Sequence, residues 1–175
     1  RSVGVEGRAG LRNAPSLLNV AYRKSLFWDG GALFLESQAL VPLEDPHEMD
    51  LPVADALDRL RQHPEYPALF AEAFEGDGPS IQTLTYALAA YQRTLVSAPT
   101  AFDRHLAGDT TALAAEARAG LALFQTHCAS CHVGAHLTSD SFENNGAAVT
   151  DADPGRERIT FSDADRGTFR VPSLR

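Results

Sequence analysis

The sequence predicts a mainly α-helical chain interrupted by long loops. Apolar residues in the middle of the chain recur at helical spacing, and no segment alternates between apolar and polar residues over a useful strand length. Glycine and proline interrupt residues 1–48 repeatedly, which predicts loops there. With 175 residues, 44% of them hydrophobic, the chain is large enough to bury a core, so we expect a folded protein.

Two helices are expected in the middle of the chain. Asp50 is placed to cap the first, with Pro52 in its first turn, and this helix should end before Pro64. Ser80 opens the second and stronger helix, which Pro99 stops. Steps of three and four residues predict one buried stripe along this second helix, made of Ile81, Leu84, Leu88, Tyr91 and Leu95.

A third helix should begin near Thr110 or Thr111 and run toward Cys128. It carries Leu113, Ala117, Leu121 and Phe124 at apolar positions. Beyond it, Ser, Asp, Asn and Gly dominate residues 139–155, which predicts a long loop.

The formal net charge of −8 leaves no basic patch, which argues against nucleic acid as a partner. No apolar stretch approaches the length of a membrane span. The start, Arg1-Ser2-Val3-Gly4, has neither a start methionine nor the layout of a signal peptide, so we expect a mature or trimmed chain.

The two cysteines of the chain belong to one pattern, Cys128-Ala129-Ser130-Cys131-His132, which is typical of covalent haem c attachment. Two thiols can each bond one vinyl group of a porphyrin, and the following imidazole can bind its iron. At a helix end these three side chains share a face. A thioredoxin-like dithiol would need a βαβ context, and a zinc site would need further ligands, for which His136 is the nearest candidate.

The sixth iron ligand is open. Met49 is the only methionine, and a Met ligand would raise the haem potential whereas a His ligand would lower it. We expect the distal ligand outside this chain. The other candidates within it are His47, His63, His105, His127 and His136.

A second group of residues surrounds the only tryptophan, Trp28, and continues through Gln38 to Glu48. Taken by themselves, these residues are explained by core packing for the indole and by a solvated carboxylate for Glu48. In addition, the segment from Arg12 to Leu17 echoes the segment from Arg170 to Arg175, each centred on a proline, which suggests a duplicated domain.

Together these segments resemble the bacterial dihaem cytochrome c peroxidase family. The resemblance runs from Val3 through Met49 and again from Gly120 through Arg175. It rests on Arg12-Asn13-Ala14-Pro15-Ser16-Leu17, Phe27-Trp28-Asp29-Gly30, Gln38-Ala39-Leu40, Pro42, Pro46, Glu48-Met49, the haem motif and Phe169-Arg170-Val171-Pro172-Ser173-Leu174-Arg175.

The resemblance implies two cytochrome c-like domains, each with a haem c. Residues 1–100 would be the remainder of the N-terminal, peroxidatic domain with the inter-domain segment, and residues 101–175 the start of the C-terminal domain. His132 would bind the iron of the second, electron-entry haem, and Trp28 would carry electrons between the haems. Gln38 and Glu48 would line the peroxide side of the first haem, where a carboxylate can move a proton between peroxide oxygens.

A calcium ion between the domains is also implied. Asn13 matches its side-chain ligand, with carbonyl oxygens of Arg170 and Pro172 as companions, a set of hard oxygen ligands that suits Ca²⁺. The implied enzyme is a periplasmic peroxidase that reduces hydrogen peroxide with electrons from a small cytochrome c or cupredoxin. Homodimers are common in the family.

Two departures matter. The other haem motif of the family is absent, so we expect the chain to be cut at its start, and it also stops where the family continues. Glu6 stands where many relatives have a histidine that ligates the resting peroxidatic haem, which implies an enzyme without that latch. Relatives that oxidise a protein substrate also lack it, so a maturation-type enzyme stays an alternative. A monohaem electron carrier is the other alternative.

Overall fold

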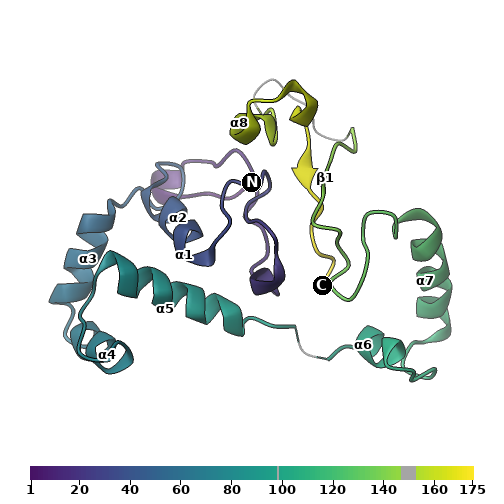
Figure 1. Ribbon diagram of the computed structural model, residues 1–175, viewed down its shortest axis with the longest axis horizontal. Coiled ribbons are helices and arrows are strands. Elements are labelled where there is room, and N and C mark those ends of the chain that lie inside the picture. The colour runs from purple at the N-terminus through teal and green to yellow at the C-terminus, as the bar shows by residue number, and fades with distance from the viewer. Residues whose placement is uncertain (98, 147–152) are drawn as a thin grey trace. The chain divides into compact units, whose positions relative to one another are not determined.

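The computed structural model describes residues 1–97, 99–146 and 153–175. Helices dominate this part of the chain, as predicted (Figure 1). The longer helices are α3 (Val53–Gln62), α4 (Tyr66–Ala73), α5 (Ile81–Thr94), α6 (Ala101–Leu106) and α7 (Ala115–His127). The shorter elements are helices α1 (Leu35–Gln38), α2 (Leu40–Glu44) and α8 (Glu157–Thr160), the 3₁₀ turns η1 (Val5–Gly7), η2 (Val20–Tyr22) and η3 (Asp163–Asp165), and strands β1 (Phe142–Glu143) and β2 (Phe169–Arg170).

The chain divides into two compact units, and each is built from two separate stretches. The first unit contains Arg1–Leu17 and Ala32–Thr94, and the second contains Leu18–Gly31 and Leu95–Arg175. Trp28 therefore belongs to the same unit as the haem motif. These compact units are not the haem domains expected from the sequence. The expected boundary between those haem domains, after residue 100, stays a prediction.

The first unit has its apolar core where α3, α4 and α5 meet. Val53 and Leu57 of α3 pack with Phe70 of α4 and Leu84 of α5, all of them buried. Stacking of Phe70 on Phe74, with ring centroids 5.9 Å apart, extends this cluster. At the other end of α5, helix α1 packs against it and the side chain of Ala89 is fully buried.

The buried stripe predicted for α5 is wrong. Leu84 is buried, but Ile81 and Tyr91 are 53% and 64% exposed. The side of α5 that is buried carries Thr83, Leu84, Thr85, Ala89 and Gln92 instead. Leu84 is buried in the core with α3 and α4, and α1 packs against α5 as well, so the contacts with all three helices decide which residues of α5 are buried.

Helix ends also differ in detail from the expectations. Asp50 does not cap α3, because Pro52 occupies the N-cap position, and Asp50 instead binds Arg8. Helix α7 begins at Ala115 rather than near Thr110. Helices α4 and α6 were not expected. The start of α6 is a capping box in which Thr100 and Asp103 bond each other's backbone N–H groups.

The second unit is mostly irregular backbone around a two-residue strand pair. Phe142 pairs with Arg170 and Glu143 with Phe169 in antiparallel register. The loop expected over residues 139–155 thus contains β1, while residues 147–152 lie outside the described part. The same strand pair brings the Trp28 backbone to β2, since the N–H of Arg170 donates to the Trp28 carbonyl at 2.7 Å.

Candidate functional site

The haem motif begins where α7 ends. Cys128 is the C-cap residue of α7, and the N–H groups of Cys131 and His132 both donate to its carbonyl, at 3.2 and 3.0 Å. This turn keeps the two thiols and the imidazole close together. Both cysteines are free, Cys128 exposed and Cys131 half-buried. The arrangement suits two thioether bonds to one porphyrin.

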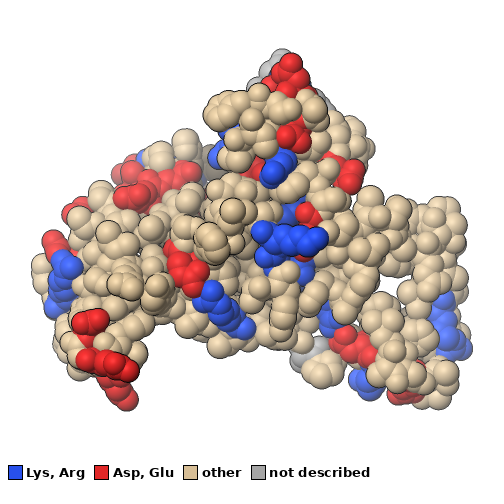
Figure 2. All heavy atoms as spheres, in the orientation of Figure 1, with Lys and Arg blue, Asp and Glu red and all other residues tan. Residues whose placement is uncertain are grey.

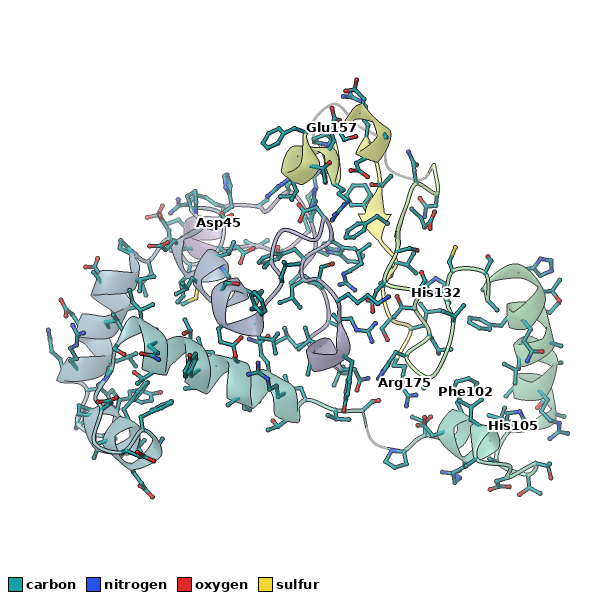
Figure 3. All side chains as sticks on the ribbon, in the orientation of Figure 1. Asp45, Phe102, His105, His132, Glu157 and Arg175 are labelled. Atoms are coloured by element: carbon teal, nitrogen blue, oxygen red, sulfur yellow. The ribbon has the colours of Figure 1, made fainter. Side chains whose placement is uncertain are left out.

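The imidazole of His132 is already oriented (Figure 3). Its Nδ1 lies 2.9 Å from the carbonyl oxygen of Leu137, and since a carbonyl can only accept, Nδ1 carries the proton. The other nitrogen, Nε2, is then the one left with a lone pair for iron, which is the tautomer that a metal-binding histidine needs. The residues present therefore fit a haem c.

The loop from Leu137 to Asp140 is fixed by a chain of hydrogen bonds. The Thr138 hydroxyl donates to the carbonyl of Val171 at 2.6 Å and accepts from the N–H of Asp140 at 3.0 Å. The N–H of Ser139 donates to the carbonyl of Cys131 at 2.9 Å. These bonds tie the carbonyl partner of His132 to β2 and to the motif itself.

Three buried charged side chains lie beside this loop. One carboxylate oxygen of Asp140 is 3.2 Å from Arg23 and 3.5 Å from Arg170, and the three side chains are 9%, 4% and 7% exposed. Burial lowers the pKa of Arg170, and Asp140 partly opposes this. Sequence reasoning missed Arg23 and Asp140, because isolated charges in loops carry no signal of burial.

Trp28 is half-buried and lies in a firmly held backbone segment. Arg170 contacts this segment twice, through its backbone to the Trp28 carbonyl and through Nε to the Phe27 carbonyl at 3.2 Å. On the other side, Asp29 is buried and paired with Arg158. The structure thus brings the Trp28 segment together with Arg170, while the electron-carrying role of Trp28 stays a prediction.

Gln38 and Glu48 both belong to the first unit. Gln38 ends α1 and is half-buried, whereas Glu48 is exposed in the turn between α2 and α3. Within the described part of the chain no hydrogen bond joins their side chains. Partial burial, and next the nearby Asp45 carboxylate, raise the pKa of Glu48. A carboxyl group with a raised pKa is a better proton acceptor than an ordinary one, as a proton-shuttling role requires.

The segment that bears Glu6 is bound to the turn that bears Glu48. The N–H of Val5 donates to the Glu48 carbonyl at 2.7 Å, and Arg8 pairs with Asp50 at 2.7 Å and with Glu6 at 3.3 Å. The Glu6 side chain is 77% exposed and engaged by Arg8. The prediction that Glu6 does not ligate the resting peroxidatic haem is not tested by this contact.

The predicted calcium ligands are distributed over both units. Asn13 is an exposed residue of the first unit, while Arg170 is buried in β2 of the second and Pro172 follows it half-buried. Among the residues that the structure describes, no three His, Cys, Asp or Glu side chains gather as a metal site. The predicted calcium ligands are carbonyl and amide oxygens, which are not among these side-chain types, so the calcium site stays a prediction.

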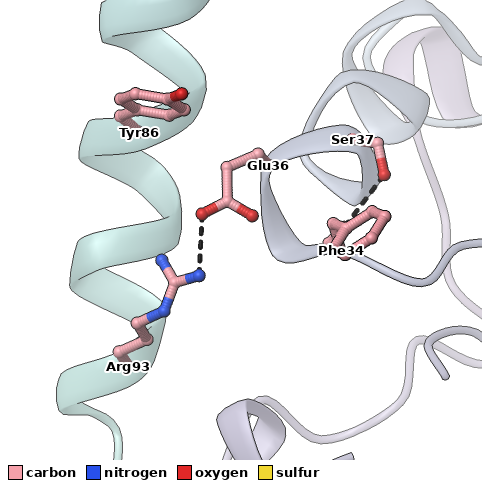
Figure 4. A pocket seen from close by; sticks show the side chains of 5 residues that line it. All are labelled: Phe34, Glu36, Ser37, Tyr86 and Arg93. Atoms are coloured by element: carbon pink, nitrogen blue, oxygen red, sulfur yellow. Dashed lines mark hydrogen bonds and ion pairs between the residues drawn. The ribbon is translucent and has the colours of Figure 1, made fainter. Parts of the chain in front are cut away.

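An open cavity of about 570 Å³ lies between α1 and α5 (Figure 4). Phe34, Ser37 and Tyr86 line it beside an ion pair in which Arg93 approaches Glu36 to 2.7 Å. Arg93 lowers the pKa of Glu36. None of the predicted site residues lines this cavity. The two charged residues that line it, Glu36 and Arg93, are paired with each other.

The helical fold, the haem motif and its oriented histidine define a c-type haem protein. The family model for di-haem cytochrome c peroxidase matches residues 1–111. The chain belongs to this di-haem peroxidase family, which confirms the resemblance and implies haem c as cofactor. The haem motif itself lies outside the matched residues, so it is evidence independent of that match.

Relatives of two kinds resemble the chain at similar identity. It is 38% identical to the methylamine utilization protein MauG of Methylophilus methylotrophus, over 97% of this chain and 52% of that protein. It is 36% identical to the cytochrome c peroxidase Ccp of Escherichia coli, over 99% of this chain and 39% of that protein. The chain thus spans about half the length, or less, of these curated relatives.

Solved structures support the fold. A MauG-like protein associated with microbial copper homeostasis superposes with a TM-score of 0.88 at 30% identity, covering 99% of this chain and 58% of that one. The diheme peroxidase BthA from Burkholderia thailandensis gives 0.82 at 23% identity, covering 99% and 54%. These neighbours confirm the mainly α class.

Two surface observations bear on partners. No helix within residues 1–97, 99–146 and 153–175 is long and apolar enough to cross a membrane. Acidic and basic side chains are interspersed over the face seen in Figure 2, and neither sign forms one continuous field there.

Proposed function

We propose that this chain is part of a periplasmic enzyme that reduces hydrogen peroxide to water. Two electrons, delivered singly by a small cytochrome c or cupredoxin, and two protons convert one peroxide into two water molecules. The observation that carries the proposal is the ready-made imidazole of His132, together with the held Trp28 segment and the raised pKa of Glu48. When bound, haem c supplies the iron that accepts and passes electrons.

The residues of the chain would divide the remaining work. Cys128 and Cys131 would hold one haem covalently, and His132 would bind its iron through Nε2. Trp28 would carry electrons toward a second haem, which we expect in the intact protein. Glu48 would take a proton from one peroxide oxygen and return it to the other as the O–O bond breaks, while the Gln38 amide orients the peroxide.

Substitution of Glu48 by Gln tests the proton-moving role. We expect a 100-fold or larger loss of peroxide turnover, on the order of the usual general acid–base contribution, with haem content unchanged. Glu72→Gln, an exposed carboxylate change on α4 in the same unit, is the matched control and should turn over normally. Unchanged turnover in the Glu48 variant would remove Glu48 from the mechanism.

A protein-oxidising enzyme is the second candidate, favoured by the 38% identity to a MauG protein and by Glu6. Steady-state oxidation of reduced cytochrome or cupredoxin by peroxide separates the two functions. Rapid donor oxidation supports the peroxidase. Poor donor oxidation, combined with peroxide-driven oxidation of side chains on a partner protein, supports the second candidate.

Counting haems and calcium ions tests the cofactors. Two covalent haems per intact protein support the di-haem enzyme, whereas one supports a monohaem carrier. We include Asn13 and the carbonyls of Arg170 and Pro172 as calcium ligands in the proposal. We expect chelation to abolish activity and added Ca²⁺ to restore it. We also expect the Asn13→Ala variant to be less active than wild type. A homodimer in solution would agree with the family resemblance.

A further inference from the structure

The function proposed above uses Arg170 for its contacts with the Trp28 segment and for its carbonyl, and it gives no role to the buried charges of Arg23 and Asp140. Two guanidinium groups share one carboxylate oxygen, and all three side chains are more than nine-tenths buried. The Arg23 Nε is also buried, and it has no hydrogen-bond partner among the residues that the structure describes. Burying charges is costly, and removal of one member of such a cluster leaves an uncompensated buried charge.

The cluster is connected to the imidazole of His132 through Leu137, Thr138 and Val171. Asp140 ends the loop that Leu137 begins, and the N–H of Asp140 donates to the Thr138 hydroxyl. The same hydroxyl donates to Val171, the residue after Arg170. The carbonyl of Leu137, directly before Thr138, accepts the Nδ1–H bond of His132. Asp140 thus holds one end of this loop through the cluster, and Thr138 holds the other end through Val171, the neighbour of Arg170.

The backbone of the loop requires such support. Leu137 has a φ of 51° and Asp140 a φ of 55°, in the left-handed region that non-glycine residues seldom adopt. Each such residue is strained, and the conformation persists only when surrounding contacts determine it. Leu137, the residue that supplies the acceptor for His132, is one of the two.

We propose that Asp140, with Arg23 and Arg170, positions the Leu137 carbonyl against Nδ1 of His132 and so sets the reduction potential of the haem bound there. The inference rests on the proposed ligation by His132. A strong Nδ1–H bond makes the imidazole a better electron donor, which favours ferric iron and lowers the potential. A loosened loop weakens this bond and raises the potential.

A through-space effect of the same charges makes a different prediction. Loss of the Asp140 charge alone would raise the potential, and loss of the Arg23 charge alone would lower it. A change at Thr138 alters no charge. Thr138→Val, which removes the hydroxyl that joins Asp140 to Val171, therefore isolates the positioning effect from the electrostatic one.

The experiment uses the intact haem-loaded protein with calcium in excess. It measures the potential of the haem by spectroelectrochemical titration and the exchange rate of the His132 ring N–H by NMR of ¹⁵N-histidine protein in the reduced state. The variants are Thr138→Val, Thr138→Ser, Asp140→Asn and Arg23→Gln. Glu157→Gln is the control, because it breaks a solvent-exposed ion pair with Arg166 in the same unit.

The expected result is a more positive potential in Thr138→Val and Asp140→Asn and a wild-type potential in Thr138→Ser and Glu157→Gln. Ring N–H exchange should be roughly five- to tenfold faster in Thr138→Val, Asp140→Asn and Arg23→Gln, as for loss of an ordinary hydrogen bond. If Asp140→Asn fails to accumulate, the two uncharged Thr138 variants decide.

Wild-type exchange and potential in Thr138→Val would overturn the inference, as would equal behaviour of the Val and Ser variants. Opposite potential shifts in Asp140→Asn and Arg23→Gln with unchanged exchange would leave only the charge effect, and would also overturn it. Failure of the proposed haem attachment looks different, since the spectrum of a thioether-linked haem would then be missing from the wild type itself. Failure of the peroxidase function alone would leave that spectrum intact and would appear as absent peroxide turnover in the wild type.

Discussion

The carboxylate of Asp29, the residue directly after Trp28, forms an ion pair with Nε of Arg158 at 3.0 Å. The Asp29 side chain is 2% exposed, and its other oxygen accepts from the N–H of Gly31 at 3.1 Å. Arg156 donates to the Asp29 carbonyl at 3.0 Å. One buried carboxylate and two arginines around α8 thus hold the turn that follows the indole.

Substitution of Asp29 by Ala should destabilise the protein by about 3 kcal/mol, because it removes the partner of Arg158 and an acceptor of the turn. The midpoint of urea unfolding measures this. Asp163→Ala, an exposed carboxylate in the same unit, should stay within about 0.5 kcal/mol of wild type. Equal effects of the two substitutions would contradict a special role for Asp29.

Gly4 lies against the backbone of the turn that carries Glu48. A Cβ at this position would collide with the carbonyl oxygens of His47 and Glu48. Gly4→Ala should therefore displace the Glu48 turn, cost about 1–3 kcal/mol of stability and lower peroxide turnover.

Gly120→Ala is the matched control for this substitution. Gly120 lies inside α7 and has no neighbour where a Cβ would be, so alanine there should stabilise the protein by roughly 0.5–1 kcal/mol. Thermal unfolding and turnover of both variants check the pair. A Gly4→Ala protein as stable and active as wild type would show that the segment adapts without disturbing Glu48.

The sequence predicted those features that depend on local pattern. The haem motif and the helix after Ser80 follow from spacing, and the structure has α5 beginning at Ile81. The family resemblance also came from short segments read in order. These signals need no knowledge of which residues meet across the fold.

The features it did not predict depend on contacts far apart in the chain. The buried residues of α5 are set by its packing against α1, α3 and α4 rather than by the apolar stripe. The pairs of Arg23 with Asp140 and of Asp29 with Arg158 join segments more than a hundred residues apart. A charged residue in a loop ordinarily predicts exposure, so only the folded chain shows that the side chains of Arg23, Asp29 and Asp140 are buried.

Glu48 should give the enzyme an ascending limb in its pH profile. Burial and the Asp45 carboxylate raise its pKa, so the ionised, proton-accepting form should appear at a higher pH than for an ordinary glutamate. Asp45→Asn removes one of the two causes, and the limb of kcat/KM against pH should move to lower pH. Asp58→Asn, a surface change on α3 in the same unit, should not move it. If Asp45→Asn left the ascending limb unchanged, or if the wild type had no such limb, ionisation of Glu48 would not control the pH dependence of kcat/KM.

Asp103 and Arg175 should make the second unit sensitive to acid. Arg175 approaches the Asp103 carboxylate to 2.6 Å, and this bond, with those from Thr100, holds the pKa of Asp103 well below its usual range. A depressed folded-state pKa stabilises the protein above the unfolded-state value, about 3.9 for Asp, and this stability is lost as the pH falls through the folded-state value.

Asp103→Asn should accordingly lower the urea midpoint at pH 7, and its difference from wild type should shrink as the pH falls below about 4, because the wild type loses its charged pair there. Arg175→Gln should reproduce most of the loss at pH 7 and show the same convergence, since the pair is one interaction. Adding the second substitution to the first should then cost little more. A difference between wild type and Asp103→Asn that stays constant from pH 7 to pH 2 would show that ionisation of Asp103 makes no contribution to the stability of the protein.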